Sequence, residues 1–283
     1  MIGELSRVVL VTGGARGIGA AFARLAVARG HRVMVADIDE SGAGSLASEL
    51  GANARHVCLD IRSPESWQAA LDTTYEVFGR LDVLVNNAAV VYPGLTKDVP
   101  LAKHKETFEV NVLGPMLGIL AVTPRFQAQA SGHVITVCSM SAFLALPGIA
   151  SYSASKSALR TLHLALALEE RGSSIDFTIV HPGATETRML EDEARKGVAV
   201  AFARPPARPE DVAKILMKAM KTKKVEICIP ESRGRSVKAI AGNPRRLLEM
   251  VEKNEQLGAK MLQERLNAHA TEHDRIEADR GQG

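Results

Sequence analysis

Short apolar runs alternate with amphipathic stretches along most of the chain. The predicted strands are continuous apolar runs at Val8–Val11, Arg32–Ala36, His56–Leu59, Val83–Asn86, His133–Cys138, Phe177–Val180 and Val225–Ile229. Helices are predicted between them at Gly17–Arg29, Ser41–Leu50, Ser66–Phe78, Lys103–Gln127, Ser155–Glu170 and Pro209–Met220. Repeated β-α-β units predict an α/β fold, a doubly wound parallel sheet of about seven strands with helices on both faces.

The pattern changes after Pro230. Asn243 and Pro244 suit the N-cap and first position of a charged helix that we expect to run to about His269. Its apolar stripe consists of Leu247, Met250, Val251, Leu257, Met261 and Leu262. We expect the stripe to pack against its own domain or a second subunit, with a membrane surface or a foreign partner as the alternative. The chain therefore divides into a domain at 1–230 and a helical extension at 231–283 with a frayed polar end.

Composition narrows the class of protein. The 283 residues, 46% of them hydrophobic, suit one large soluble domain with an appendage, and a net charge of +3 gives no reason to expect nucleic acid. We see no secretory signal and no apolar stretch that we judge long enough to span a bilayer. Cys58, Cys138 and Cys228 share no metal-ligand spacing, so we expect reduced thiols, no metal and a cytoplasmic protein.

A glycine-rich loop joins the first predicted strand to the first predicted helix. It reads Thr12-Gly13-Gly14-Ala15-Arg16-Gly17-Ile18-Gly19. Glycines let the backbone turn sharply and approach a pyrophosphate, and a helix N-terminus offers free N–H groups. Asp37 ends the next predicted strand, near the spacing at which an acid binds the adenosine ribose. Together these features predict a Rossmann-type dinucleotide site.

Two side chains bear on the choice of dinucleotide. The Asp37 carboxylate would repel the 2′-phosphate of NADP, and Ile38 after it supplies no compensating cation. Arg16 in the loop points the other way, because a cation there can meet that phosphate. Since Asp37 would contact the ribose directly, we expect NAD rather than NADP.

Tyr152 and Lys156 lie four residues apart within a helical pattern, so they project from one helix face. A phenol with a pKa of about 10 is a poor base near neutrality, and a nearby ammonium is one means of lowering that pKa. Ser139, thirteen residues before the tyrosine, can hold a substrate oxygen while the phenol moves its proton. These three residues predict an alcohol or carbonyl redox enzyme.

With these residues in place, the chain resembles the short-chain dehydrogenase/reductase family over residues 5–230. The family's glycine motif falls on Thr12, Gly13, Gly17 and Gly19, and its Asn-Asn-Ala-Gly motif falls on residues 86–89 with Ala89 in place of the last glycine. The resemblance implies the catalytic residues Asn111, Ser139, Tyr152 and Lys156. It implies cofactor contacts from Gly13, Arg16, Gly17, Ile18, Gly19, Asp37, Asp60, Ile61, Asn87, Ala88, Tyr152, Lys156, Pro182, Gly183, Thr185 and Thr187. It also implies a homodimer or homotetramer.

A role for Asn111 can also be predicted from the residues around it. Pro115, four residues later, has no N–H, so the Asn111 carbonyl loses its usual helical donor. We expect a kinked helix that leaves this carbonyl free to hold a water, as the family's proton relay requires. The alternative is a simple helix break with Asn111 as a capping residue.

The substrate is predicted from the segments expected around the pocket, 90–95, 140–149 and 184–202. Their large apolar side chains are Val91, Tyr92, Phe143, Leu144, Leu146, Met189, Leu190 and Phe202. They favour an apolar secondary alcohol or ketone, such as a steroid, retinoid, terpenoid or lipid-like compound. Arg188, Arg195 and Arg204 offer the alternative of an anionic group, and residues 191–197 are expected to form a mobile lid. His181 is expected to be a packed strand-end residue.

Two other classes of function stay open. One is a non-catalytic NAD(H)-binding sensor or scaffold, although such proteins tend to lose the tyrosine or lysine that this chain keeps. The other is an interaction protein whose C-terminal helix carries the function.

Overall fold

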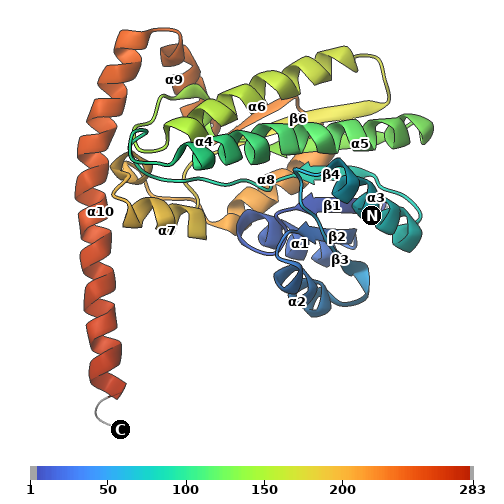
Figure 1. The fold of residues 1–283 in the computed structure, drawn as a ribbon, viewed down its shortest axis with the longest axis horizontal. Helices are drawn as coiled ribbons and strands as arrows, with labels where there is room; N and C mark the ends of the chain where they lie inside the picture. Colours follow the sequence, from blue (N-terminus) through green and yellow to red (C-terminus); the bar gives the residue numbers. More distant parts are fainter. Residues whose placement is uncertain (1–4, 281–283) are drawn as a thin grey trace.

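The structure is a computed structural model that describes residues 5–280, with side chains described as far as Asn267. Its strands are β1 Val8–Thr12, β2 Arg32–Asp37, β3 Ala54–Cys58, β4 Val83–Asn86, β5 Gly132–Val137, β6 Ile175–Pro182 and β7 Glu226–Ile229. They form one parallel sheet in the order β3-β2-β1-β4-β5-β6-β7 (Figure 1). The predicted doubly wound sheet is confirmed, and the strand order reverses between β1 and β4.

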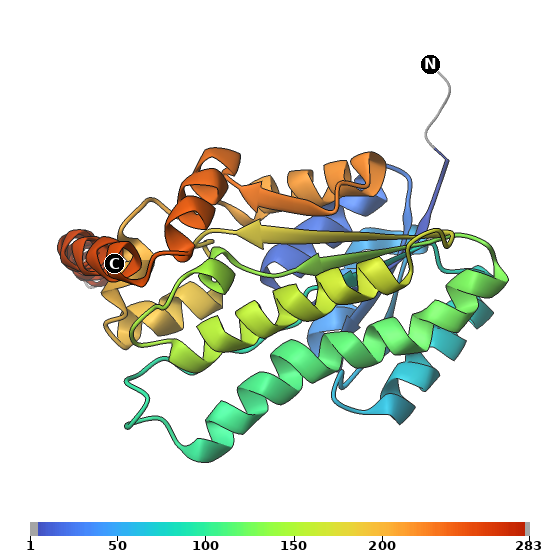
Figure 2. The same cartoon turned by 90° about the horizontal axis from the view of Figure 1, so that it is seen from above.

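Helices cover both faces of the sheet (Figure 2). One face carries α1 (Gly17–Ala28), α2 (Glu40–Leu50) and α8 (Pro209–Thr222), and the other carries α3 (Pro64–Phe78), α5 (Gly114–Ala128) and α6 (Ala150–Glu169). Successive side chains of β1 supply both cores, since Val9 and Val11 pack with the first set and Val8 and Leu10 with the second. Burial on both faces explains why the strands read as continuous apolar runs.

The helical segment from Leu101 to Ala128 is not one regular helix. A π turn, Glu109–Leu113, separates α4 (Leu101–Phe108) from α5, in place of the kink predicted from Pro115. By length and composition this segment is apolar enough to cross a membrane, which corrects the expectation that no stretch is. In the fold it behaves as a core helix, because Ile119, Val122 and Phe126 are buried against the sheet.

The C-terminal third adds helices that the apolar pattern did not predict. They are α7 (Arg188–Arg195), a 3-10 turn at Ala199–Phe202 and α9 (Glu231–Ala241). The predicted last helix is α10 (Pro244–Arg280), longer than expected; residues 281–283 of the predicted frayed end lie outside the described range. Asn243 caps it as predicted, accepting a hydrogen bond from the Arg246 N–H at 3.1 Å.

Helix α10 packs closely against the 3-10 turn beside α7 (Figure 1). A Cβ on Gly258 would lie 1.9 Å from the carbonyl oxygen of Ala199, so only glycine allows this approach. Val251 and Leu262 are buried as predicted, but Leu257 is 47% exposed because Gly258 takes the contact position. The helix therefore holds residues 188–202 against the body. The proposed division at residue 230 stays a prediction.

Candidate active site

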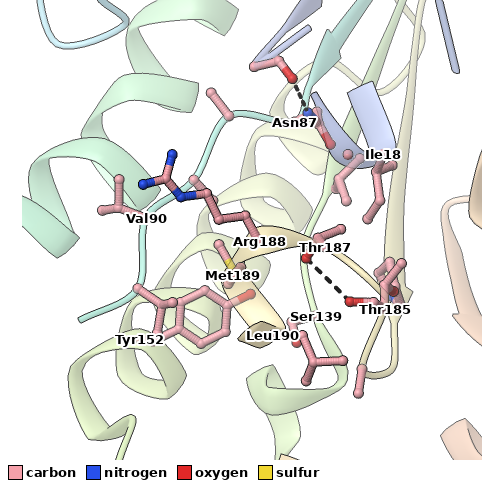
Figure 3. Close-up of a pocket in the computed structure, with 18 of the residues that line it drawn as sticks. Ile18, Asn87, Val90, Ser139, Tyr152, Thr185, Thr187, Arg188, Met189 and Leu190 are labelled. Carbon is pink, nitrogen blue, oxygen red and sulfur yellow. Dashed lines mark hydrogen bonds between the residues drawn. The ribbon is translucent and has the colours of Figure 1, made fainter. Parts of the chain in front are cut away.

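A cavity of about 890 Å³ opens at the carboxyl ends of the strands, where the strand order reverses. Most residues predicted for the site line it, and Figure 3 shows several of them around one space. The predicted residues that line it are Gly13, Arg16, Gly17, Ile18, Asp37, Asp60, Ile61, Asn87, Ala88, Ser139, Tyr152, Lys156, Pro182, Gly183, Thr185 and Thr187. Gly19 and Asn111 are set back from it, behind residues that line the cavity.

The glycine loop is shaped for a phosphate group. Gly13 and Gly17 have φ values of +62° and +56°, which favour glycine, and a Cβ on Gly19 would lie 2.2 Å from the Gly13 carbonyl oxygen. The Asn87 Nδ2 fixes the loop by donating to the carbonyls of Thr12 at 2.9 Å and Gly13 at 3.1 Å. No side chain caps the N-terminus of α1, so its first N–H groups remain available to an anion. These residues fit a dinucleotide pyrophosphate.

Asp37 is held in place by the loop. Its side chain is buried, with Oδ2 accepting from the Ala15 N–H at 2.9 Å and Oδ1 from the Asp39 N–H at 3.0 Å. The Arg16 guanidinium forms an ion pair with Asp39. The cation that argued for NADP is therefore already paired with a carboxylate, whereas Asp37 lines the cavity.

Asp60 and Ile61 follow strand β3 and line the same cavity as the glycine loop. Arg62 binds the Asp60 carboxylate, and its hydrogen bond holds the pKa of Asp60 below the usual value. The Trp67 indole N–H donates to the Ile61 carbonyl at 3.0 Å and fixes the turn. The adenine contact that the resemblance implies for these two residues stays a prediction.

Tyr152 and Lys156 share helix α6, which begins at Ala150 rather than at the predicted Ser155. The Lys156 Nζ lies 5.6 Å from the centroid of the tyrosine ring and donates to the Val137 carbonyl at 3.3 Å. Ser139 follows β5, and its side chain is near enough to the phenol to favour a lower pKa of Tyr152. In Figure 3 the phenol points into the cavity toward Ser139. The three side chains predicted to do the chemistry thus meet.

The electrostatics of the pair differ from the expectation. Burial raises the pKa of Tyr152 above its ordinary value, Glu193 and Cys138 act in the same direction, and the Ser139 hydrogen bond opposes them. Burial also lowers the pKa of Lys156. Lys156 alone therefore does not lower the phenol's pKa, because burial disfavours both charged forms.

Asn111 acts as a buried clamp. Its Oδ1 accepts from the Val90 N–H at 2.9 Å, and its Nδ2 donates to the Val90 carbonyl at 2.9 Å and to the Ser155 Oγ at 3.1 Å. Ser155 in turn donates to the Tyr152 carbonyl at 2.7 Å. Asn111 lies in the π turn and is no helix cap; the water expected at its carbonyl stays a prediction.

The substrate half of the cavity is mostly apolar. Of the side chains predicted to line it, Val91, Tyr92, Leu144, Leu146, Met189 and Leu190 do so. Phe143 instead stacks on His181, and Phe202 packs with Leu262 of α10. The expectation for these two was wrong because each contacts an element that is remote in sequence.

The charged residues of the substrate half were predicted only in part. Arg188 and Arg204 line the cavity, but Arg195 pairs with Asp192 at 2.9 Å. No sequence pattern indicated Arg233 of α9, which also lines the cavity and whose pKa is lowered by burial. Glu193 was equally missed, and burial raises its pKa to about 7.

His181 lies behind Ser139, outside the cavity lining. Its Nδ1 contacts the Ser139 carbonyl and its Nε2 contacts Glu226, each at 3.0 Å. Burial lowers the pKa of His181, but contacts with Cys138 and Glu226 outweigh it and raise the value to about 9. The predicted packing role agrees with this arrangement.

Comparison with known proteins decides the family. A family profile described as short chain dehydrogenase matches residues 7–197. The chain belongs to this family. It is an oxidoreductase that interconverts alcohols and ketones with NAD or NADP. The comparisons thus favour an enzyme over the alternative of a non-catalytic NAD(H)-binding sensor.

Three relatives illustrate the likeness of this short-chain dehydrogenase to others. It is 37% identical to the 3-alpha-(or 20-beta)-hydroxysteroid dehydrogenase of Mycobacterium bovis, over 66% of this chain and 72% of the relative. It is 34% identical to the trans-4-hydroxycyclohexanecarboxylate dehydrogenase of Sinomonas cyclohexanicum, over 65% of this chain and 74% of the relative. The crystal structure of the 3-ketoacyl-(acyl-carrier-protein) reductase of Brucella melitensis with NADH superposes with a TM-score of 0.73 at 26% identity, covering 78% of this chain and 95% of that one.

Proposed function

We propose that this enzyme interconverts a cyclic secondary alcohol and its ketone, uses NAD in preference to NADP, and transfers the proton through Tyr152. The observation that carries the proposal is the meeting of Tyr152, Ser139 and Lys156 beside the glycine loop in one cavity. These three residues are sufficient to transfer the proton and to bind the substrate oxygen in this reaction.

The chemistry divides between cofactor and protein. Bound NAD supplies the acceptor for the hydride that leaves the carbinol carbon. Tyr152 removes the hydroxyl proton during oxidation and returns it during reduction. Ser139 orients the substrate oxygen by a hydrogen bond, and Lys156 holds the nicotinamide ribose. Asn111 positions Tyr152 through Ser155.

The cofactor would lie along the loop and strand ends. The backbone at Gly13 and Gly17 and the free end of α1 would bind the pyrophosphate, and Asp37 the adenosine ribose. Asp60 and Ile61 would flank the adenine. At the nicotinamide end the contacts would come from Asn87, Ala88, Pro182, Gly183, Thr185 and Thr187. NAD is favoured because Arg16 is paired with Asp39.

The substrate class rests on the apolar lining and on the relatives. A cavity lined by Val91, Leu146 and Met189 suits an alicyclic ring system. Relatives named for a hydroxysteroid and for a hydroxycyclohexanecarboxylate support the same class. A cytoplasmic homodimer or homotetramer remains a prediction from the family resemblance.

The test is a panel of cyclic secondary alcohols and ketones assayed with NAD and with NADP. In Tyr152→Phe we expect turnover to fall by about a thousandfold, because no group of similar reach replaces the phenol. NADH affinity, measured by fluorescence titration, should change by less than about threefold. Tyr75→Phe, far from the cavity, is the matched control. Comparable turnover in Tyr152→Phe would rule out this assignment.

A further inference from the structure

Helix α7 carries three acidic residues in a row, and one of them turns inward. Glu191 and Asp192 are exposed and lie 3.9 Å and 2.9 Å from the Arg195 guanidinium, and Asp192 also borders the cavity. Glu193 is only 7% exposed and lines the cavity. The same short sequence thus carries two exposed carboxylates that are paired with Arg195 and one buried carboxylate.

The inward carboxylate has no partner within the described part of the chain. No described side chain or backbone N–H donates to it, and no described cation pairs with it. A buried carboxyl without a donor is costly, typically about 1–3 kcal/mol for the missing hydrogen bonds and more if it is charged. A ligand that brings a donor to this oxygen removes that cost.

The surroundings fix where Glu193 points. It lies one turn beyond Met189 and Leu190, which line the substrate half, and its charge acts on the Tyr152 phenol. Leu190 packs with Leu262 of α10, which keeps α7 from rotating outward. The carboxylate is therefore a fixed feature of the substrate pocket.

The charge of the cavity selects the kind of donor. Arg188, Arg204 and Arg233 line the same cavity, and their positive charge disfavours a cationic ligand. An uncharged hydroxyl donates to a carboxylate without meeting that repulsion. Val91, Leu146, Met189 and Leu190 line the same half of the cavity, so the hydroxyl that suits it is carried by a largely apolar molecule.

We propose that Glu193 binds a second hydroxyl group of the substrate, remote from the carbinol that Tyr152 deprotonates. The substrate class is then an alicyclic diol or hydroxyketone, of which one carbinol is oxidised and the other is used for recognition. This inference rests on the proposed function of the cavity and adds a specificity-determining residue to it.

Binding tests the proposal separately from catalysis. The unaltered protein is saturated with NADH, which cannot accept a hydride, and titrated by calorimetry with matched pairs of probes. The pairs are cyclohexanol with cyclohexane-1,4-diol, and androstan-3-ol with androstane-3,17-diol. We expect the diol of at least one pair to bind about tenfold more tightly, as a hydrogen bond to a charged group allows.

Variants then assign the preference to Glu193. Glu193→Leu should abolish the preference for the diol while still binding the mono-alcohol, and Glu193→Gln should keep part of it. Glu191→Gln, on the exposed face of α7, is the matched control and should keep all of it. Equal binding of both members of every pair, or failure of every probe to bind, overturns the proposal. Turnover of the mono-alcohols with NAD is measured in parallel, and its absence would count against the proposed function alone.

Discussion

The two halves of the cavity are built in different ways. On the cofactor side the expected pyrophosphate site is backbone, made by Gly13, Gly17 and the free end of α1 within a short stretch of chain. On the substrate side it is made by side chains such as Met189, Arg204 and Arg233. These come from separate segments, and α10 packs against the 3-10 turn at Ala199–Phe202 that follows α7. The mobile lid expected at residues 191–197 stays a prediction.

The two modes of construction suit the different molecules that the two halves recognise. A pyrophosphate is the same in every dinucleotide, so a fixed loop of N–H groups can bind it. Substrates differ from one enzyme to another, and the side chains on the C-terminal helices can differ accordingly. The predictions below separate the two halves, beginning with the largest expected effect.

Gly19→Ala should break the cofactor half. Its Cβ would meet the Gly13 carbonyl oxygen at 2.2 Å, so the loop has to move away from the position that Asn87 fixes. We expect NADH affinity to fall by about a hundredfold or the protein to lose its fold, measured by fluorescence titration and thermal melting. Gly242→Ala, whose Cβ would meet no atom within 4 Å, is the control. Unchanged affinity would show that the loop adjusts at little cost.

Gly258→Ala should break the substrate half. The new methyl group cannot fit 1.9 Å from the Ala199 carbonyl oxygen, so α10 has to separate from the 3-10 turn and uncover Phe202 and Leu262. We expect kcat/KM for a cyclic alcohol to fall by about tenfold or more, while NADH affinity changes by less than about threefold. An equal loss of NADH affinity would mean that the halves are not separable.

Asp37→Asn tests discrimination between cofactors. The amide keeps an oxygen for the Ala15 N–H and removes the charge that would repel a 2′-phosphate. We expect the ratio of kcat/KM with NAD to that with NADP to fall by about tenfold. Asp72→Asn, exposed on α3, serves as the control. A ratio that does not move would assign the preference to another residue.

Glu193→Gln should have the smallest effect, visible in the pH profile. With a pKa of about 7, Glu193 is ionised above that pH, and its negative charge raises the pKa of Tyr152. Removing the charge makes the phenol easier to deprotonate, so the rising limb of kcat/KM for oxidation of a mono-alcohol should move to lower pH by less than about one unit. A shift to higher pH would contradict the coupling, and Glu191→Gln should show none.

The two halves also differ in what the sequence could reveal. The glycine loop, Asp37 and the Tyr152–Lys156 spacing are local patterns, and most residues of this set line the cavity. Glu193 and Arg233 could not be found this way, because their inward orientation depends on how α7 and α9 pack. The raised pKa of Tyr152 was missed for a related reason, since burial is a property of the assembled fold.

The strand ends and the buried stripe of α10 also show which features a local sequence pattern can predict. The strands were predicted to within two residues at every end, because burial on both faces produces a clear apolar run. Leu257 was assigned to the buried stripe of α10 by periodicity alone. The close contact at Gly258 rotates that stripe, and no local pattern carries this information.

The π turn at Glu109–Leu113 sets the phase of a long helix. A π turn takes up about one residue more than an α turn, and one residue corresponds to roughly 100° of rotation. This offset lets Asn111 clamp Val90 and Ser155 on one side of the turn while Ile119 and Phe126 meet the sheet on the other. Deleting a single residue here would convert the segment to a regular helix and force a choice between the two faces. The spacing between residues 109 and 113 thus decides whether Asn111 reaches Val90 and Ser155.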